Sequence, residues 1–349
     1  MLQLRSWILF TLALSGSACT EAQSKDSAPA KKDEQGAPVQ QPVTTIRLAD
    51  EGNAGLLAYA KREGVLEREL AKVGAKIEWV PAAGAFSANF EAMNSGTINT
   101  SRAAVSPIVG ALAHNLRFKV FAVAERGTGI QSGVISPKGS SIRRVEDLVG
   151  KRVALNLAAH GDYVLLRSLQ KFGIPADKVQ RVPIQPPDAA AAFATGKVDA
   201  WSTFGVFLTT AVNNGANVLV SEDQIESDDV GVISANVETL KSNPLAYRTL
   251  LKVLADLTEL AHREPEKFQN VFTDKGPTAA SGAVLQANIE ETRKAPSFHV
   301  PASVDKERIA NVAKLLFEND SIDRDIRVDE IVFDIDAAAT AAASATGVR

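Results

Sequence analysis

Arg102 is a residue whose type and position favour the binding of an oxyanion. It lies at the predicted turn between a strand and a helix at 107–114. A guanidinium at such a turn can hold two anion oxygens at once, helped by the free backbone N–H groups of the following helix. Ser101 stands beside it as a second candidate ligand. Alternatively, Arg102 is a surface arginine that pairs with Glu91 or Glu125.

A loop of small residues at 158–162 is another candidate anion site. His160 can donate a hydrogen bond, and Gly161 leaves the backbone N–H groups accessible. The alternative is that Asp162 caps the following helix and that His160 is a solvated loop residue.

Turns after the first two predicted strands supply further candidates. Asn53 follows the strand at 45–49, where a glycine permits close approach to the backbone. Asn53 could equally cap the next helix. Gly84 and Phe86 follow the strand at 76–80. Phe86 could cover an organic tail, although a buried aromatic residue in the first turn of a helix is commoner.

Trp201 and Phe204 lie at the end of a predicted strand in the second half of the chain. Together they could form an apolar wall against the organic part of a ligand. Alternatively, Trp201 packs in the core and Phe204 alone faces the ligand.

Catalysis has little support among these residues. Cys19 is the only cysteine, and the four histidines are scattered along the chain. Neither a G-x-S-x-G motif nor a Walker-type phosphate loop occurs. We therefore expect no enzyme activity, no cofactor and no metal.

The first residues have the pattern of a secretory signal, with a positive charge at Arg5, an apolar run at 7–14 and small residues before Cys19. A lone cysteine directly after such a site favours lipid attachment. We predict a signal peptide at 1–18 and a lipid anchor at Cys19, in the periplasm or on the outer face of the cell membrane. The alternative is a plain signal peptide with Cys19 at the new N-terminus.

Residues 19–43 have almost no large apolar residue, which predicts a disordered tether.

The roughly 300 residues after the tether are too many for one typical core and suit two lobes. The net charge of −3 gives no field that would favour nucleic acid. No apolar run after the signal approaches the length that crosses a bilayer.

Strands and helices alternate along two consecutive segments, which predicts two parallel α/β sheets. In the first segment the predicted strands are 45–49, 76–80 and 118–124, and the helices are 56–73, 87–95 and 107–114. In the second the strands are 133–136, 152–155, 179–183, 199–203 and 217–220, and the helices are 161–172, 188–195 and 206–213. After residue 242 the pattern is mostly helical, with a frayed end from 328. Ligands bind at the carboxyl ends of strands in such sheets, so two facing sheets form a cleft that can close.

Four segments, taken in this order and spacing, are fairly specific for one protein family. They are LLAYAKREGVLERE at 56–69, SPIVGALA at 106–113, KGSSIRRVEDLVGKRVALN at 138–156 and PDAAAAFATGKVDAWSTFGVFL at 187–208. With them the chain resembles the solute-binding components of ABC importers for nitrate, taurine and alkanesulfonates. The resemblance implies an α/β, two-lobed periplasmic binding protein fold of type II with the ligand cleft between the lobes. It also implies an ABC permease as partner, and we expect a monomer.

That fold assigns 44–126 and 223–340 to lobe 1, 127–222 to lobe 2 and 341–349 to a flexible tail. Glu125 and Arg126 would then be polar groups near the hinge.

Two departures from the family narrow the expected ligand. The family often has an acidic residue where this chain has Val105 and Gly205, and such acids suit a ligand with an ammonium group. Their absence, with Arg102 close by, favours anions without a positive charge. We expect a sulfonate, sulfate ester, nitrate or carboxylate, captured by hinge closure. The alternative is a sensory or scaffold lipoprotein of the same fold that signals to a membrane receptor.

Overall fold

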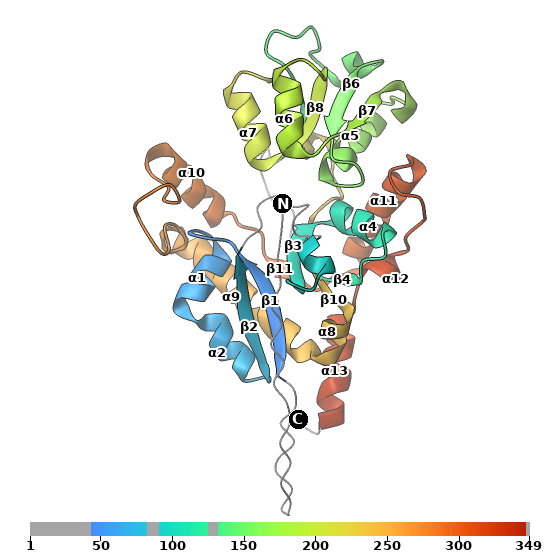
Figure 1. Cartoon of the computed structure of the whole chain (residues 1–349). Helices are drawn as coiled ribbons and strands as arrows, with labels where there is room; N and C mark the ends of the chain where they lie inside the picture. The colour runs from blue at the N-terminus through green and yellow to red at the C-terminus, as the bar shows by residue number, and fades with distance from the viewer. Residues whose placement is uncertain (1–42, 82–90, 125–131, 347–349) are drawn as a thin grey trace, which may run out of the picture. The chain divides into compact units, whose positions relative to one another are not determined.

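The computed structural model of the protein describes residues 43–81, 91–124 and 132–346 (Figure 1). These residues belong to one compact unit. Predictions that fall outside the described residues are the signal peptide, the tether, Cys19, Gly84, Phe86, Glu125 and Arg126.

The first sheet has the strand order β11-β4-β10-β3-β1-β2 within the described residues. Its strands are β1 (Thr44–Asp50), β2 (Ala75–Pro81), β3 (Thr100–Ala104), β4 (Phe118–Ala124), β10 (Gly231–Asn236) and β11 (Phe298–His299). The α-helices of this part are α1 (Leu56–Glu63), α2 (Val65–Ala71), α4 (Val105–Ala113), α8 (Val237–Ser242), α9 (Pro244–Arg263), α10 (Gly282–Arg293), α11 (Ser303–Glu318), α12 (Val328–Ile331) and α13 (Ile335–Thr346). A short 3₁₀ helix, η4 (Pro265–Phe268), follows α9.

The second sheet has the order β7-β6-β8-β5-β9. Its strands are β5 (Ser132–Ser136), β6 (Arg152–Leu155), β7 (Gln180–Pro183), β8 (Ala200–Phe204) and β9 (Asn217–Ser221). Its helices are α5 (His160–Lys171), α6 (Pro186–Ala194) and α7 (Gly205–Asn213), with the short η1 (Val145–Leu148), η2 (Ala176–Lys178) and η3 (Glu222–Ile225). Two α/β sheets confirm the predicted fold class.

Both sheets are mixed, so the prediction of purely parallel sheets was wrong. β10 runs antiparallel to β3 and β4, and β5 runs antiparallel to β8 and β9. The chain leaves the first sheet after β4 and returns to it only with β10. The returning strand is therefore not part of a β-α-β crossover, which is the unit that makes neighbouring strands parallel.

The start of α9 is fixed by a capping side chain and a proline. At the start of α9, the Asn243 side chain accepts a hydrogen bond from the Ala246 N–H at 3.1 Å, and Pro244 occupies the first helical position. α13 packs against α9 and continues to Thr346, within the range predicted as a tail. No helix in the described part of the chain is both long and apolar enough to span a membrane.

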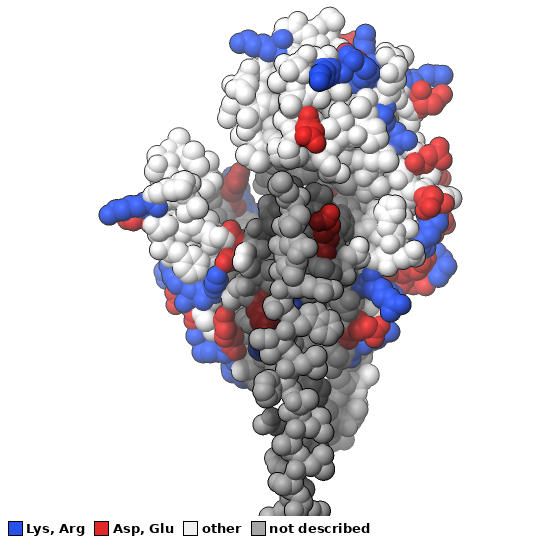
Figure 2. Space-filling view, viewed as in Figure 1, with Lys and Arg blue, Asp and Glu red and all other residues white. Residues whose placement is uncertain are grey.

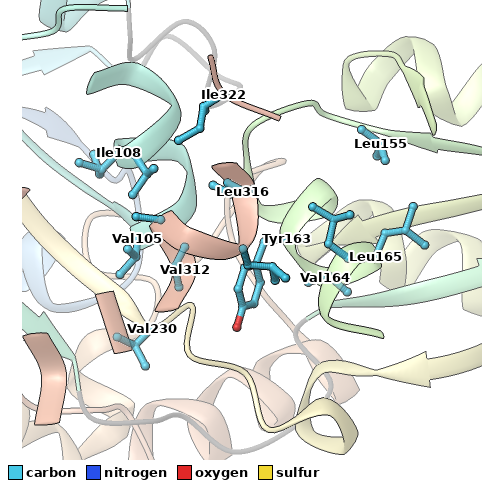
Figure 3. Packing of buried hydrophobic residues seen from close by; sticks show 14 of the residues in the cluster. Val105, Ile108, Leu155, Tyr163, Val164, Leu165, Val230, Val312, Leu316 and Ile322 are labelled. Atoms are coloured by element: carbon cyan, nitrogen blue, oxygen red, sulfur yellow. The ribbon is translucent and has the colours of Figure 1, made fainter. Parts of the chain in front are cut away.

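A continuous hydrophobic core joins elements of both sheets (Figure 3). It is built on α4 and α11 from the first part and on α5 and β6 from the second. Its fully buried side chains include Val105, Ile108, Leu155, Val164, Val312 and Leu316. Because buried apolar area stabilises a fold by about 25 cal/mol per Å², this shared packing ties the two sheets together.

Candidate ligand-binding cleft

A cavity of about 800 Å³ lies between α4 and the loops that follow β6, β7 and β8. We call it the large cavity. Its volume lies within the range of about 300–1,000 Å³ that is usual for small-molecule sites. The lining from the first part is Asn94, Pro107, Gly110, Ala111, His114 and Leu116. The lining from the second part is Asn156–Ala159, Gln185–Pro187 and Phe204–Phe207. The cavity therefore opens at the carboxyl ends of three neighbouring strands, where ligands bind in open α/β sheets.

Three helices begin at this lining: α5 at His160, α6 at Pro186 and α7 at Gly205. In none of them does the N-cap side chain accept a hydrogen bond from the helix. The start of α7 is the most favourable of the three for an anion, because α6 begins with Pro186 and Pro187, which have no N–H, and the Gly161 N–H of α5 already donates to Asn156 Oδ1 at 2.9 Å. Among the described lining residues there is no Lys, Arg, Asp or Glu. The cavity thus combines backbone donors for a negative head with apolar walls for an organic tail.

Phe204 and Gly161 are the predicted site residues that lie at or next to this cavity. Phe204 lines it, and its ring meets the ring of His160 edge-on at 5.4 Å between centroids. A Cβ on Gly161 would lie 2.5 Å from Asn156 Oδ1 and 2.7 Å from the Ser202 carbonyl oxygen. Glycine is therefore required for α5 to begin this close to the end of β8.

His160 contacts the ring of Phe204 and lies between two carboxylates, those of Glu222 and Asp229. Its Nδ1 is 2.7 Å from Asp229 Oδ2, and its Nε2 is 3.4 Å from Glu222 Oε2. Burial by itself would lower the pKa of the imidazole, but the negative charges of Glu222 and Asp229 outweigh it and raise this pKa to about 10. His160 is therefore a cation at neutral pH, with both ring nitrogens already engaged.

Asp229 also caps α4. Its Oδ1 accepts a hydrogen bond from the Ser106 N–H at 2.7 Å, and its Oδ2 accepts one from the Ser106 hydroxyl. The Asp229 N–H donates in turn to Ser227 Oγ at 3.1 Å. The N-terminus of α4, which the sequence suggested for the anion beside Arg102, is thus occupied by a carboxylate of the chain itself.

Glu222 completes this group from the start of η3. It accepts hydrogen bonds from the hydroxyls of Ser132 and, at 2.7 Å, Ser227. Burial would raise the pKa of the Glu222 carboxyl, but the adjacent His160 and these hydroxyls outweigh it and lower the pKa to about 2. The group of His160, Glu222 and Asp229 joins α5, the return segment to β10 and α4.

Arg102 lies in a different place from the large cavity. It lines a smaller cavity of about 250 Å³ with Glu51 and Phe298. The guanidinium forms an ion pair with Glu51 and lies 5.4 Å from the centroid of the Phe298 ring. Within the described residues its ion-pair partner is Glu51 rather than Glu91, and Glu125, the other acid expected from the sequence, lies outside them.

Asn53 is saturated by contacts with the loop that follows η4. Its Oδ1 accepts hydrogen bonds from the N–H groups of Phe272 and Thr273, and its Nδ2 donates to the carbonyl oxygens of Thr273 and Thr278. All of these contacts fix the loop at 271–278, so the side chain serves local structure here.

Ser101 and Trp201 are buried. The Ser101 hydroxyl contacts the Arg102 carbonyl oxygen at 3.4 Å. Trp201 is only 3% exposed and packs against Phe193 and Phe207, at 5.7 and 6.0 Å between ring centroids. Trp201 therefore packs on the second sheet and at the same time lines a smaller apolar cavity there.

The structure therefore brings Phe204, His160 and Gly161 together and leaves Arg102 and Asn53 apart from them. Sequence reasoning missed Glu222 and Asp229, which are 62 and 69 residues from His160 in the chain. The acidic pair Asp228–Asp229 before a short apolar stretch was the only available signal. Among the described residues no group of three His, Cys, Asp or Glu could hold a metal ion.

Comparison with known families places residues 91–268, just over half of the chain, on the model of a family described as NMT1/THI5 like. A protein of Bacillus subtilis named for binding aliphatic sulfonates is 27% identical over 66% of this chain and 69% of its own length. The taurine-binding periplasmic protein of Escherichia coli is 28% identical over 38% of this chain, but only 41% of its own length.

The fold is shared with solved binding proteins. The alkanesulfonate-binding protein SsuA from Xanthomonas axonopodis, solved with bound MOPS, superposes with a TM-score of 0.69 at 22% identity. The superposition covers 83% of this chain and 98% of that protein. At this identity the likeness shows the two-lobed fold.

Proposed function

This chain belongs to the NMT1/THI5-like family, and from that premise we propose that it is the solute-binding protein of an ABC importer that captures a small organic anion. The observation that supports this most is the apolar cavity at which three helices of the second sheet begin. The relatives named for sulfonates and taurine point to the same class of ligand.

The cavity favours an organic sulfonate or sulfate ester among the anions expected from the sequence. A volume of about 800 Å³ is far larger than nitrate needs, and its walls include Leu157, Phe204 and Phe207. Three sulfonate oxygens can accept from several N–H groups at the start of α7, whereas a carboxylate has only two oxygens. An inorganic anion would leave the apolar walls without a partner.

Capture follows from lobes that can change their separation. A head group at the start of α7 replaces water with fixed N–H donors. Contacts with the ligand from the α4 side of the cavity tighten as the cavity closes, so the ligand binds the closed form more tightly and shifts the population towards it.

Isothermal titration calorimetry tests this proposal with methanesulfonate, taurine, methyl sulfate, nitrate and acetate. We expect heat of binding for the sulfonate and the sulfate ester, and little for nitrate. No heat of binding for any of the five compounds would overturn the proposal.

A matched pair of variants tests the site within the same experiment. Val206 is 71% exposed in the first turn of α7 and lines the cavity. Val206→Asp adds a negative charge where the anion should lie, so we expect at least a tenfold loss of affinity. Val206→Asn has the same size without the charge and should bind nearly as well as the wild type. Equal affinities for both variants would mean that the anion binds elsewhere.

We further propose that the mature protein lies outside the cytoplasmic membrane, anchored through a lipid on Cys19. The charged, apolar and small residues before Cys19 support this, as does the periplasmic relative. Labelled palmitate should be incorporated by the wild type and not by Cys19→Ser. Equal labelling would exclude the anchor.

An ABC permease is the proposed partner, and the protein is proposed to act as a monomer. Reconstituted with that permease, the ligand-loaded protein should stimulate ATP hydrolysis more than the ligand-free protein. The absence of any stimulation, in a protein that binds the ligand, would favour the sensory alternative.

A further inference from the structure

A second apolar cavity, of about 580 Å³, lies between α6 and α7 on the second sheet. Its aromatic lining is Phe193 from α6, Trp201 from β8 and Phe207 from α7. We call this cavity the α6–α7 groove. It continues along α7 to Asn214, which is one residue beyond the helix. Since α7 rises 1.5 Å per residue, the groove is about 13 Å long.

The groove is adjacent to the large cavity, because Val206 and Phe207 line both. The large cavity includes the start of α7, and the groove lies between α7 and the part of α6 from Ala190 onward. A ligand whose anionic head lies at the start of α7 therefore has an apolar groove on the other side of Val206 and Phe207.

The helix α7 is loosely packed for an element of this size. Leu208 is its only buried residue, and Val206 and Val212 are exposed although both are apolar. α7 contains no charged residue and α6 contains only Asp188. Figure 2 shows the corresponding surface as mostly uncharged. Uncovered apolar surface of this kind marks a place where another apolar group binds.

We propose that the ligand is an organosulfonate with a long alkyl or an aryl tail, and that its tail lies in the α6–α7 groove. This inference rests on the proposed function, since it takes the sulfonate head to lie at the start of α7. Burial of one methylene is worth about 0.8 kcal/mol, so each added carbon should tighten binding up to about fourfold while the tail still enters the groove.

A series of linear sulfonates measures this directly. Affinities of the mature protein for methane-, butane-, octane- and decane-1-sulfonate are determined by calorimetry below their micelle concentrations. We expect the affinity to rise through octanesulfonate. A plateau at butanesulfonate would overturn the inference and leave the proposed function intact, whereas no binding of any sulfonate would overturn the proposed function itself.

Two neighbouring substitutions on α7 locate the tail. Thr210 lines the groove, while Thr209 is exposed and lines neither cavity. Thr210→Phe fills the groove, so the affinity for octanesulfonate should fall at least tenfold with that for methanesulfonate unchanged. Thr209→Phe adds the same ring outside the groove and should change neither. Equal effects of both variants on octanesulfonate would contradict the inference.

Tryptophan fluorescence gives an independent readout. Trp201 lines the groove, and Trp79 lies in β2 of the first sheet, where its Nε1 donates to Glu67. In a mature Trp79→Phe variant, octanesulfonate should shift the emission of Trp201 and methanesulfonate should not. Uncharged octanol serves as the control for the head group. Octanol binding as tightly as octanesulfonate would overturn the assignment, since it would show an apolar groove without a sulfonate site.

Discussion

The carboxylate of Asp229, in the segment that returns to β10, contacts both α4 and α5. It accepts hydrogen bonds from the Ser106 N–H and hydroxyl, and it pairs with His160. Its side chain is fully buried, so the negative charge depends on these partners rather than on water.

The first prediction concerns this carboxylate. Asp229→Asn removes the charge that offsets buried His160, so we expect the free energy of unfolding to fall by about 3 kcal/mol. Asp228→Asn is the matched control, because the Asp228 carboxylate accepts only a bond from Asn311 in an exposed position. That variant should change the free energy by about 0.5 kcal/mol or less. Urea denaturation measures both, and similar values for the pair would contradict the role given to Asp229.

The second prediction concerns pH. Because the folded-state pKa of His160 is raised from 6.5 to about 10, the stability it contributes is complete below about pH 6.5 and is lost as the pH rises through about 10. Because the pKa of Glu222 is lowered from 4.5 to about 2, its contribution is complete above about pH 4.5 and is lost towards pH 2.

The free energy of unfolding, measured in urea between pH 5 and 10, should therefore decline above neutrality. His160→Gln should flatten this decline, since the variant has no group that titrates at this position. A wild type and a variant that share the same slope would rule out His160 as its source.

At the scale of the elements, the approach of α4 to the second sheet depends on one glycine. A Cβ on Gly110 would lie 2.2 Å from the carbonyl oxygen of Ala158. This oxygen belongs to the backbone of the loop that lines the large cavity, so it cannot move away as a side chain would.

Gly110→Ala, the third prediction, should therefore push α4 away from the loop at 156–159. We expect a loss of about 2 kcal/mol in the free energy of unfolding, as is typical of overpacking. The affinity for sulfonate should fall as well, because both sides of the cavity move. Calorimetry and urea denaturation measure the two effects, and an unchanged variant would show that the contact is not tight.

Elements with a strong local pattern were predictable from the sequence. The strand at 118–124 is confirmed, and the predicted helix at 161–172 appears as His160–Lys171. β10 was not predicted, because its six residues include Gly, Ser and Asn and follow an acidic turn. Its place in the middle of a sheet comes from tertiary pairing with β3 and β4.

The candidate site was predictable only in part, for a related reason. Phe204 is the last residue of β8 and Gly161 follows β6 after a short loop, so the rule that ligands bind at the carboxyl ends of strands finds them. Arg102 fits the same rule, but the pairing with Glu51 and the place beside Phe298 depend on contacts distant in the chain. Glu222 and Asp229 reach His160 only because the chain returns to the first sheet through them.

At the scale of the whole molecule, the second sheet is an insertion within the first. The first sheet takes strands from both sides of residues 132–221, which supply all strands of the second. The two parts are then joined through α11, which packs against both α4 and α5. Arg181 of β7 adds polar contacts, donating to Ser321 Oγ at 2.8 Å and to the Asn319 carbonyl oxygen.

The apolar packing of α4, α5 and α11 has a thermodynamic consequence. Two parts with separate hydrophobic cores would unfold one after the other. A hydrophobic core shared by both parts instead makes the folding of each part depend on the other. Differential scanning calorimetry should therefore record one endotherm, with equal calorimetric and van't Hoff enthalpies. Two resolved endotherms would refute such all-or-none behaviour. A residue exchanged in this common interior would then weaken both halves at once.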